Sequence, residues 1–540
     1  MVSGNRRSFF WKLAGLAALP ASAGARPGNS VSGTRQEQAL RLRQTAALAQ
    51  SRQPQASHPN NGDETSLANY IGSYCKGLPH TQSGEVQPSA YQSLLAALEE
   101  GTETAMEGIQ RGSGAKLINP LSGYAFQMEG ADSHVWGMAP PPAFSSAAGA
   151  GEMVELYWQA LCRDVPFTQY ESSPVTTAAV QDLNRLSAFA GPTSSGKVTS
   201  DTLFRGNVAG GLEGPFISQF FWQPVPVNST NIEQMYRQGM AGVDYLNNFA
   251  EWLALQNGVP PFLSWTADPK LRYIYNGRSL AEWVHYDFLY QAYHNTALIL
   301  LDQSPDTVLD TNPYLSPTNP YKTTKVETGF GTFGAPHICS ILGTVCIAAL
   351  YAAWYQKWMV HRRLRPEEFG GRVHQAKVGA ANYPIHADLL NSAALPMVFA
   401  ANNSYLLPQA FPEGCPLHPS YPQGHGTVAG ACATMLKAFF DETQIVTNCV
   451  VASDDGLSLS PYTGSALTVG GEINKLAFNV AMGRDFAGIH YRSDAEAGFL
   501  LGEQVAMAVL QDMVNTYAES FSGFDFTSMD GTPVTIGARG

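Results

Sequence analysis

Charged residues are scarce in this chain. Only 14% of its 540 residues are Asp, Glu, Lys or Arg, and 44 acidic residues outnumber 32 basic ones, which gives a net charge of −12. Because nucleic-acid binding generally needs a basic surface, the acidic balance argues against a nucleic-acid partner. The low charge together with 44% hydrophobic residues instead fits a large buried interior or extensive subunit contacts.

Cysteine is also sparse. The seven cysteines are an odd number, and no two of them are arranged as Cys-x-x-Cys. This pattern argues against a disulfide framework and against a zinc site built from paired cysteines. At most a few of them are expected to pair, and we expect Cys339 and Cys346 to pack in the core.

Long uncharged runs are few. Residues 338–356 form one, and it is long enough to cross a membrane. It also contains Cys, Ser, Gly, Thr and Gln, and no convincing second span exists elsewhere. The run therefore predicts a core helix, and we expect no transmembrane anchor in the mature chain.

The N-terminus has the pattern of an export signal. Arg6 and Arg7 precede an apolar stretch at residues 13–19 and a small-residue stretch at residues 21–25. This order is typical of a twin-arginine signal peptide covering residues 1–25, which predicts a periplasmic or secreted mature chain. The alternative is a chance pair of arginines before an apolar start.

Three short stretches contain the groups that could bind an oxyanion. They are residues 357–366 (KWMVHRRLRP), 418–425 (HPSYPQGH) and 484–494 (RDFAGIHYRSD). A multiply charged tetrahedral anion loses much of its water when it is bound, so it needs fixed positive charge and N–H donors in compensation. Each stretch alone is a weak signal, but the three in this order are a strong one.

The residue types in these stretches suit that chemistry. Arg365 and Arg484 can each present a planar fork of donors, and Lys357 adds a compact charge. Gly424 allows the backbone N–H to approach an anion oxygen. Histidines add a ring nitrogen that can be neutral, protonated or a ligand.

The local pattern predicts how the first stretch is placed. Trp354 and Lys357 are three residues apart, so they share one face of a helix. Pro366 disfavours helical geometry at the residue before it, which predicts that Arg365 lies at a helix exit.

The other two stretches lie near predicted helix starts. Gly424 to Thr427 precede a small-residue helix over about residues 428–440, and Ser493 with Glu496 fits a capping box that begins another helix. Two helix N-termini would therefore point toward the site, and helix N-termini favour anions.

Other segments are predicted from their patterns alone. Residues 35–50 and 280–301 predict helices, and residues 524–536 predict a short hairpin. Strand signal is otherwise scarce, so the class is mainly α. Arg362 and Arg363 are interpreted as structural ion-pair partners or surface charges.

The three motifs together resemble those of vanadium-dependent haloperoxidases, which share their anion site with acid and lipid phosphatases. The likeness is strongest to the bromoperoxidase type of marine algae and its bacterial relatives, over roughly residues 35–520. It implies a mainly α fold over residues 26–540, with two four-helix bundles around the oxyanion site and few short strands. It also implies a catalytic core at about residues 280–515 and assembly into a homodimer or larger homo-oligomer.

The resemblance implies one vanadate per chain. The positions that it implies for vanadate binding are Lys357, Arg365, Gln423, Gly424, His425, Arg484 and His490. His490 would bond vanadium, His425 would be the acid–base residue, and Lys357 would also polarise the bound peroxide. Hydrogen peroxide would then oxidise a halide to a hypohalous acid equivalent that halogenates an organic acceptor, with vanadium acting as a Lewis acid.

Four further residues are candidates for supporting roles. His418 and Trp354 occupy positions that suggest bromide and iodide rather than chloride, and His418 is also a catalytic candidate. Asp494 could pair with an active-site histidine or serve as a first-turn acid of a helix. Asp287 could orient a catalytic histidine from another helix.

Gln423 departs from the family pattern, which usually has serine before the Gly-His pair. Glutamine could still donate through its amide, although its longer side chain must fold back to do so. Alternatively, Gln423 caps its own helix from Ser420 and contributes nothing to the anion. Loss of one hydrogen bond to a charged group costs about 1.5–3 kcal/mol, so anion affinity could fall tenfold or more.

Two other functions stay open from the sequence. A phosphatase of the same superfamily would use His490 as a nucleophile and form a phosphohistidine. A non-catalytic protein would bind phosphate or vanadate tightly and turn over neither, with Gln423 having degraded the site.

Overall fold

Helices dominate the computed structural model, which describes residues 33–301 and 312–537; the predicted export signal lies outside this part of the chain. The helices are α1 Arg35–Ser51, α2 Asp63–Ser66, α3 Pro88–Glu100, α4 Glu103–Glu107, α5 Ala147–Cys162, α6 Pro174–Leu183, α7 Phe249–Gln256, α8 Gly277–Trp283, α9 Gln291–Leu301, α10 Ala335–Tyr355, α11 Pro366–Lys377, α12 Ala387–Leu390, α13 Ala394–Asn402, α14 Gly424–Phe439, α15 Val469–Phe486 and α16 Arg492–Val514. The mainly α class is confirmed, as is the predicted helix at residues 35–50.

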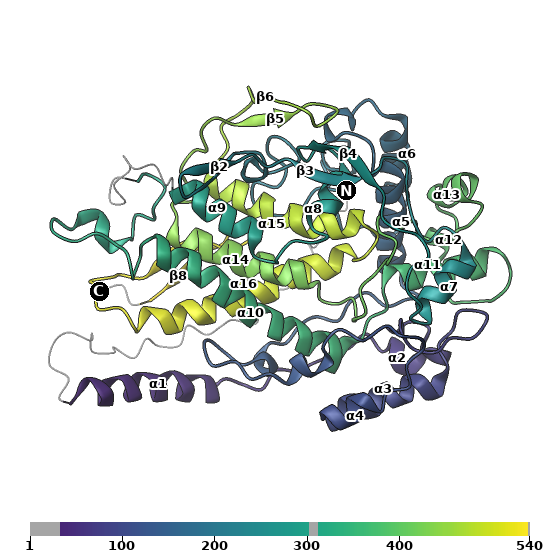
Figure 1. Cartoon of the computed structure of the whole chain (residues 1–540), viewed down its shortest axis with the longest axis horizontal. Coiled ribbons are helices and arrows are strands. Elements are labelled where there is room, and N and C mark those ends of the chain that lie inside the picture. The colour runs from purple at the N-terminus through teal and green to yellow at the C-terminus, as the bar shows by residue number, and fades with distance from the viewer. Residues whose placement is uncertain (1–32, 302–311, 538–540) are drawn as a thin grey trace, which may run out of the picture.

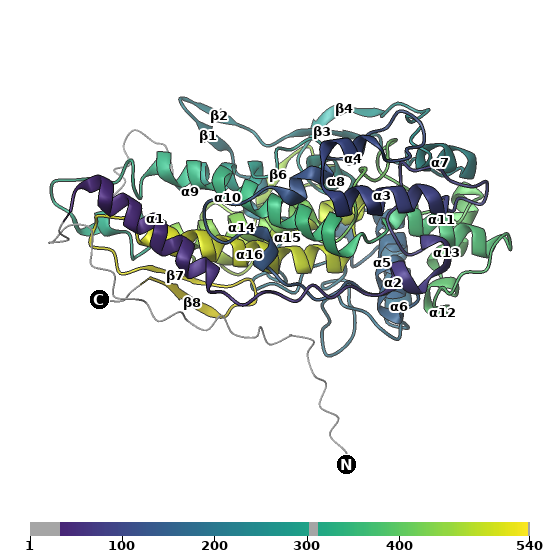
Figure 2. The ribbon, with the colours of Figure 1, turned by 90° about the horizontal axis from the view of Figure 1, so that it is seen from below.

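Strands occur only as short antiparallel pairs in the described part of the chain. The pairs are β1 Val225–Val227 with β2 Thr230–Ile232, β3 Tyr236–Gly239 with β4 Ala267–Arg272, β5 Val450–Ala452 with β6 Leu459–Pro461, and β7 Phe524–Thr527 with β8 Pro533–Ile536. The last pair is the predicted C-terminal hairpin, and Figure 2 shows it beside α16.

A bundle of long helices forms the centre of the molecule. Helices α10, α14, α15 and α16 run along its long axis, with α14 in contact with the other three (Figure 1). Glycines allow α14 and α16 to approach closely: a Cβ at Gly502 would lie 1.9 Å from the Thr427 oxygen, and one at Gly430 would lie 2.2 Å from the Phe499 oxygen. Larger residues at these two glycines would push the helices apart.

A second group of helices lies at one end of the bundle. Helix α5 contacts α6, α12 and α13, and it also touches α15 of the central bundle (Figure 1). Nearly all of α5 is buried, including Glu152 and Glu155. Buried carboxylates need partners, and these two pair with arginines near the ends of other elements.

The long apolar run is a core helix, as predicted. By length and composition, residues 335–361 are the one described helical stretch that could cross a membrane, but half of its apolar window is buried in the fold. α10 packs on α14 and α16, and the chain then continues as a π-helical segment, Gln356–His361. Such segments often lie at functional sites, and this one contains Lys357.

Residues 280–301 do not form the single predicted helix. α8 ends at Trp283, α9 begins at Gln291, and a loop joins them. Side chains and carbonyls of this loop make tertiary contacts that a continuous helix would not permit, so these contacts override the local helical preference.

All seven cysteines are free thiols in the structure, and Cys346 is buried as predicted, whereas Cys339 is half-buried. No disulfide therefore contributes to this fold within the described residues, and stability comes from packing and buried polar networks.

Candidate oxyanion site

The three sequence motifs meet at one end of the central bundle. Lys357 lies on the π-helical segment after α10, Arg365 lies just before α11, and Arg484 lies in the last turn of α15. His490 lies in the short connection to α16. The structure thus brings together groups that are more than 130 residues apart in the chain.

Arg365 is fully buried at the centre of this group. Its Nε donates to the His418 carbonyl at 2.8 Å, Nη1 donates to the Ile489 carbonyl at 3.1 Å, and Nη1 lies 2.9 Å from His490 Nε2. Pro366 does remove Arg365 from helical geometry, with φ −80° and ψ 155°. The residue lies at the start of α11 rather than at a helix exit, because the proline begins the new helix.

Lys357 is also fully buried. Its ammonium donates to the carbonyls of Pro419 and Ser420, both at 2.8 Å, and lies 5.9 Å from the centre of the Trp354 ring. Burial and the neighbouring Arg365 guanidinium hold the pKa of Lys357 well below the usual lysine value. Its charged form is therefore poorly stabilised by the protein alone.

Arg484 is the least satisfied of the three cations. Its Nη1 donates to the Val284 carbonyl at 2.7 Å, whereas its buried Nε has no hydrogen-bond partner. Burial lowers the pKa of Arg484 to about 10, although Asp287 acts in the opposite direction. An unpartnered buried guanidinium nitrogen is costly unless a ligand accepts from it.

The three cations lack a carboxylate partner. Within residues 33–301 and 312–537, no Asp or Glu lies at salt-bridge distance from Lys357, Arg365 or Arg484; the nearby acids pair with other groups. Buried charges are normally paired. This excess of positive charge, with an open donor on Arg484, fits a bound oxyanion such as vanadate or phosphate.

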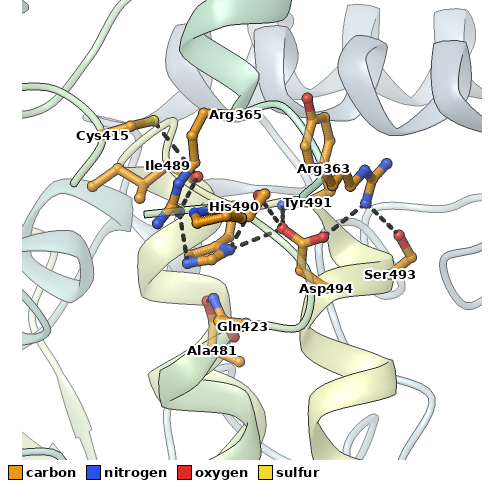
Figure 3. Close-up of polar contacts among 12 residues, drawn as sticks. Arg363, Arg365, Cys415, Gln423, Ala481, Ile489, His490, Tyr491, Ser493 and Asp494 are labelled. Atoms are coloured by element: carbon orange, nitrogen blue, oxygen red, sulfur yellow. Dashed lines mark hydrogen bonds and ion pairs between the residues drawn. The ribbon is translucent and has the colours of Figure 1, made fainter. Parts of the chain in front are cut away.

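His490 is held by a buried carboxylate (Figure 3). Its Nδ1 lies 2.8 Å from Asp494 Oδ2, which also accepts from the Ser420 hydroxyl. With the ring proton assigned to Nδ1, Nε2 carries a lone pair. Burial, together with Arg365 and Lys357, holds the pKa of His490 well below the usual histidine value. The neutral ring can therefore act as a metal ligand through Nε2.

Asp494 is itself fixed by an arginine. Arg363 Nη1 donates to Asp494 Oδ1 at 2.7 Å (Figure 3). Its Nη2 pairs with Glu152 on α5 at 2.7 Å. The interpretation of Arg363 as a structural ion-pair partner is confirmed, and Arg362 likewise pairs with Glu64. The Arg363–Asp494 pair sets the orientation of His490.

His418 and Trp354 lie side by side next to Arg365. Their ring centres are 4.9 Å apart, and Arg365 Nη2 lies 2.9 Å from His418 Nδ1. Burial and the adjacent Arg365 and Lys357 hold the pKa of His418 well below the usual value. A neutral, buried imidazole next to an indole forms one wall of the site.

His425 and Asp287 form a second histidine–carboxylate pair. His425 Nε2 lies 2.9 Å from Asp287 Oδ1, and its side chain is 15% exposed. The structure thus places Asp287 where it can orient this ring. With Nε2–H donating to Asp287, Nδ1 is free to accept a proton.

The side chain of Gln423 makes no cap hydrogen bond to its helix, and its amide does not join the groups that would donate to an oxyanion. Its fully buried amide nitrogen donates to the Ala481 carbonyl on α15 at 3.0 Å, and it makes no cap hydrogen bond to α14. Figure 3 shows the side chain apart from the group around His490. The capping alternative is therefore wrong, and the amide is occupied elsewhere, tying α14 to α15.

Both helix starts differ in detail from the prediction. α14 begins at Gly424 itself rather than near residue 428, so Gly424 supplies a first-turn N–H. α16 begins at Arg492, and the acid that accepts from the backbone of Tyr491 is Asp494, not Glu496. The Ser493–Glu496 capping box is wrong because Asp494 serves this helix start and His490 together.

Sequence reasoning missed two contacts of the site. Ser420 lies inside the second motif, and its hydroxyl donates to Asp494. The Val284 carbonyl accepts from Arg484, a contact that no side-chain pattern could reveal. The serine could have been noted from its place between two motif histidines.

Fold and site together define a mainly α protein with a buried, cation-lined oxyanion site. A family described as the VCPO second helical-bundle domain matches residues 337–519. A vanadium-dependent bromoperoxidase from Ascophyllum nodosum is 36% identical over 500 residues, covering 88% of each chain, and one from Corallina officinalis is 32% identical, covering 88% of this chain and 92% of that relative. The chain therefore belongs to the vanadium-dependent bromoperoxidase family.

A solved structure agrees with this assignment. The homohexameric structure of the second vanadate-dependent bromoperoxidase (AnII) from Ascophyllum nodosum matches with a TM-score of 0.88 and 29% sequence identity, covering 96% of this chain and 95% of that one. The family resemblance that was predicted from the three motifs is thus confirmed, and it extends over nearly the whole chain.

Proposed function

We propose that the chain is a vanadate-dependent haloperoxidase that uses hydrogen peroxide to oxidise halide, with bromide and iodide favoured over chloride. The observation that carries the proposal is the set of three buried cations without carboxylate partners around a neutral His490. Vanadate, when bound, supplies the Lewis acidity that activates hydrogen peroxide toward halide.

The residues of the chain have distinct roles in this proposal. Lys357, Arg365 and Arg484 would bind the oxyanion oxygens, together with the first-turn N–H of Gly424 at the start of α14. His490 would supply its Nε2 lone pair as the ligand, and the hydrogen bond from Nδ1 to Asp494 keeps that lone pair available.

His425 would handle the proton. Oxidation of a halide ion by hydrogen peroxide to hypohalous acid and water consumes one proton, and His425 Nδ1 can hold it while Asp287 accepts from Nε2. The partial exposure of His425 allows exchange of that proton with solvent. Hypohalous acid would then halogenate an organic acceptor.

The test is bromination of a phenol dye by the purified chain with hydrogen peroxide and bromide. We expect activity that requires added orthovanadate and falls with excess phosphate. His490→Ala should abolish this activity and weaken vanadate binding, because the ligand nitrogen is lost. Hydrolysis of a phosphate monoester that vanadate inhibits, without halide oxidation, would instead indicate a phosphatase.

We also propose a homo-oligomer. The AnII structure is described as homohexameric, and this chain matches 95% of its length. Light scattering of the purified protein after size exclusion should give a mass that is a multiple of the mature chain, and a monomer at micromolar concentration would contradict the proposal.

Localisation is proposed from the N-terminal pattern. Arg6 and Arg7 before an apolar stretch support twin-arginine export to the periplasm or the medium, with cleavage near residue 25. Replacing both arginines by lysine should retain the uncleaved chain in the cytoplasm. Unchanged export of that variant would exclude this route.

A further inference from the structure

The loop between α8 and α9, residues 284–288, holds two groups of the oxyanion site. The Val284 carbonyl accepts from Arg484 Nη1 at 2.7 Å, and Asp287 Oδ1 lies 2.9 Å from His425 Nε2. The positions of the Arg484 guanidinium and the His425 ring therefore depend on where this loop lies.

Apart from the Val284 carbonyl, the main chain of the loop makes only local hydrogen bonds in the described structure. His285 N donates to the Glu282 carbonyl at 3.1 Å, and Gln291 N donates to the Phe288 carbonyl at 2.7 Å. The side chains of Tyr286 and Phe288 are 79% and 49% exposed. These contacts leave the loop with few anchors of its own, so a buried side chain must hold it against the rest of the protein.

His285 is such a side chain. It is 5% exposed, with Nδ1 3.3 Å from Glu282 Oε1 and Nε2 2.5 Å from Glu413 Oε1. Its ring stacks on Phe411, with centres 3.5 Å apart and planes within 7°. Glu282 is fixed in turn by Trp265 Nε1, which donates to its other oxygen at 3.1 Å.

Two partners of the His285 ring, Phe411 and Glu413, belong to the segment that leads into the oxyanion site. Phe411 and Glu413 precede His418 by a few residues, and Lys76 Nζ anchors the Glu413 carbonyl at 2.9 Å. His285 therefore connects the α8–α9 loop to the same stretch that leads to Gly424.

We infer that His285 is a positioning residue: clamped between Glu282 and Glu413, it fixes the loop that holds Arg484 and His425 in place. It touches neither the oxyanion donors nor the reacting atoms directly. Only the kinetic readouts of this inference rest on the proposed function, because anion binding can be measured without halide oxidation.

The charge of the ring supports the clamp. Burial opposes a charged imidazole, but hydrogen bonds with Glu282 and Glu413 outweigh it and raise the pKa of His285 above the usual histidine value. Lys76, Tyr286 and Arg484 are charged or titratable groups that interact electrostatically with Glu413. Below its raised pKa the ring donates to both carboxylates, and as the pH rises through that pKa one of the two hydrogen bonds is lost.

The experiment is a double-mutant cycle between His285→Ala and Asp287→Asn. We expect His285→Ala to lower kcat about tenfold, because small misplacements of acting groups cost one to two orders of magnitude. It should also weaken the binding of inorganic phosphate, measured by calorimetry, because the acceptor of Arg484 moves. In the Asp287→Asn background it should lower kcat by clearly less than tenfold, since the link to His425 is already broken and only the contact with Arg484 is left to disturb.

Two more variants separate positioning from general stability. His285→Gln can donate to one carboxylate without titrating, so it should restore phosphate affinity in part and remove the decline of kcat at alkaline pH that belongs to His285. His294→Ala is the matched control, since that ring lies on α9 and contacts Tyr290 edge-on, and it should match the wild type.

The inference would be overturned if the losses in kcat of the two single variants multiply in the double mutant. It would also be overturned if His285→Ala leaves kcat and phosphate affinity unchanged. If His285→Ala does not fold, Glu413→Gln removes one arm of the clamp at a side chain that is 43% exposed, and the same cycle applies. If the wild type oxidises no halide, the proposed function fails, and the phosphate affinities of the wild type, His285→Ala and His285→Gln still decide the role of His285.

Discussion

The side-chain amide of Gln423 points toward α15, and a neighbouring glycine makes this orientation possible. A Cβ at Gly426 would lie 2.9 Å from Gln423 Oε1, so the missing side chain leaves room for the amide to fold back. Gln423 Oε1 is buried without a hydrogen-bond partner. The position therefore contributes no side-chain donor to the oxyanion in this arrangement.

Restoring a short donor should strengthen anion binding. Gln423→Ser places a hydroxyl beside the first turn of α14, and one hydrogen bond to a charged group is worth about 1.5–3 kcal/mol. We expect the Kd for vanadate to fall tenfold or more, as measured by calorimetry or by vanadium NMR of the purified protein without peroxide or halide.

The matched control is Gln423→Ala, which also removes the amide bond to Ala481 but adds no donor. Its vanadate affinity should equal that of the wild type. If serine and alanine change affinity equally, the effect comes from the lost contact with α15, and the missing-donor explanation is wrong.

Much of the site could be predicted at this scale. Residue type and spacing predict the chemistry of the lysine, the two arginines and the histidines. The structure brings these residues together. The direction of Gln423 could not be predicted, because a long flexible side chain takes the rotamer that its neighbours allow, and those neighbours, Gly426 and Ala481, come from two different helices.

At the scale of elements, Arg363 connects three parts of the fold. It lies before α11, pairs with Asp494 in the first turn of α16 and with Glu152 on α5, and lies 3.8 Å from the centre of the Tyr491 ring. The pair that orients His490 thus also joins the central bundle to the second group of helices.

Removing this cation should destabilise the fold strongly. Arg363→Met keeps much of the side-chain volume but leaves Glu152 and Asp494 without their shared cation. Breaking a buried ion pair costs about 3–5 kcal/mol, so the free energy of unfolding in urea should fall by that order. Vanadate binding should weaken as well, because His490 loses its fixed acceptor.

The neighbouring arginine provides the comparison. Arg362→Met breaks the pair with Glu64, where both side chains are partly exposed at 13% and 18%. The free energy of unfolding should fall less in Arg362→Met than in Arg363→Met, since solvent can stabilise both partly exposed charges. Equal losses in the two variants would mean that burial of the Arg363 network has no special effect.

Element boundaries were harder to predict than element types. Helices at residues 35–50 and over the apolar run were predicted correctly, whereas residues 280–301 were wrongly joined into one helix. Local propensity favoured continuity there, but His285 and Asp287 are held by residues far away in the chain, and those contacts cannot be read from a local pattern.

At the scale of the whole molecule, buried neutral histidines predict sensitivity to acid. Burial lowers the pKa of His361 to about 3, and neither of its ring nitrogens has a hydrogen-bond partner. The pKa of His80 is also lowered to about 3, mainly by burial. Below the unfolded-state pKa of about 6.5 the unfolded chain binds these protons and the folded chain does not, so stability falls as the pH drops.

His361→Phe tests this contribution. The ring packs edge-on against Tyr421, with centres 4.7 Å apart, so an aromatic replacement keeps the contact. Each such histidine costs about 1.4 kcal/mol per pH unit well below 6.5. Between pH 6.5 and 4.5, the free energy of unfolding of the variant should therefore fall by about 2 kcal/mol less than that of the wild type.

The comparison variant is His134→Phe, at a side chain that is 44% exposed. It should leave the pH dependence close to that of the wild type, because the replacement removes no buried imidazole. An identical acid profile for His361→Phe and the wild type would show that His361 is protonated in the folded chain.

The sequence by itself determined the class of this protein, its mainly α fold and the identity of the oxyanion-binding groups, because charge, donor geometry and motif order are properties of residues along the chain. Tertiary structure alone decided which cations lack a carboxylate, where the amide of Gln423 points, and how His285 holds the loop beside Arg484 and His425. These features depend on contacts between segments that are remote in the chain, and such contacts exist only after the helices have packed.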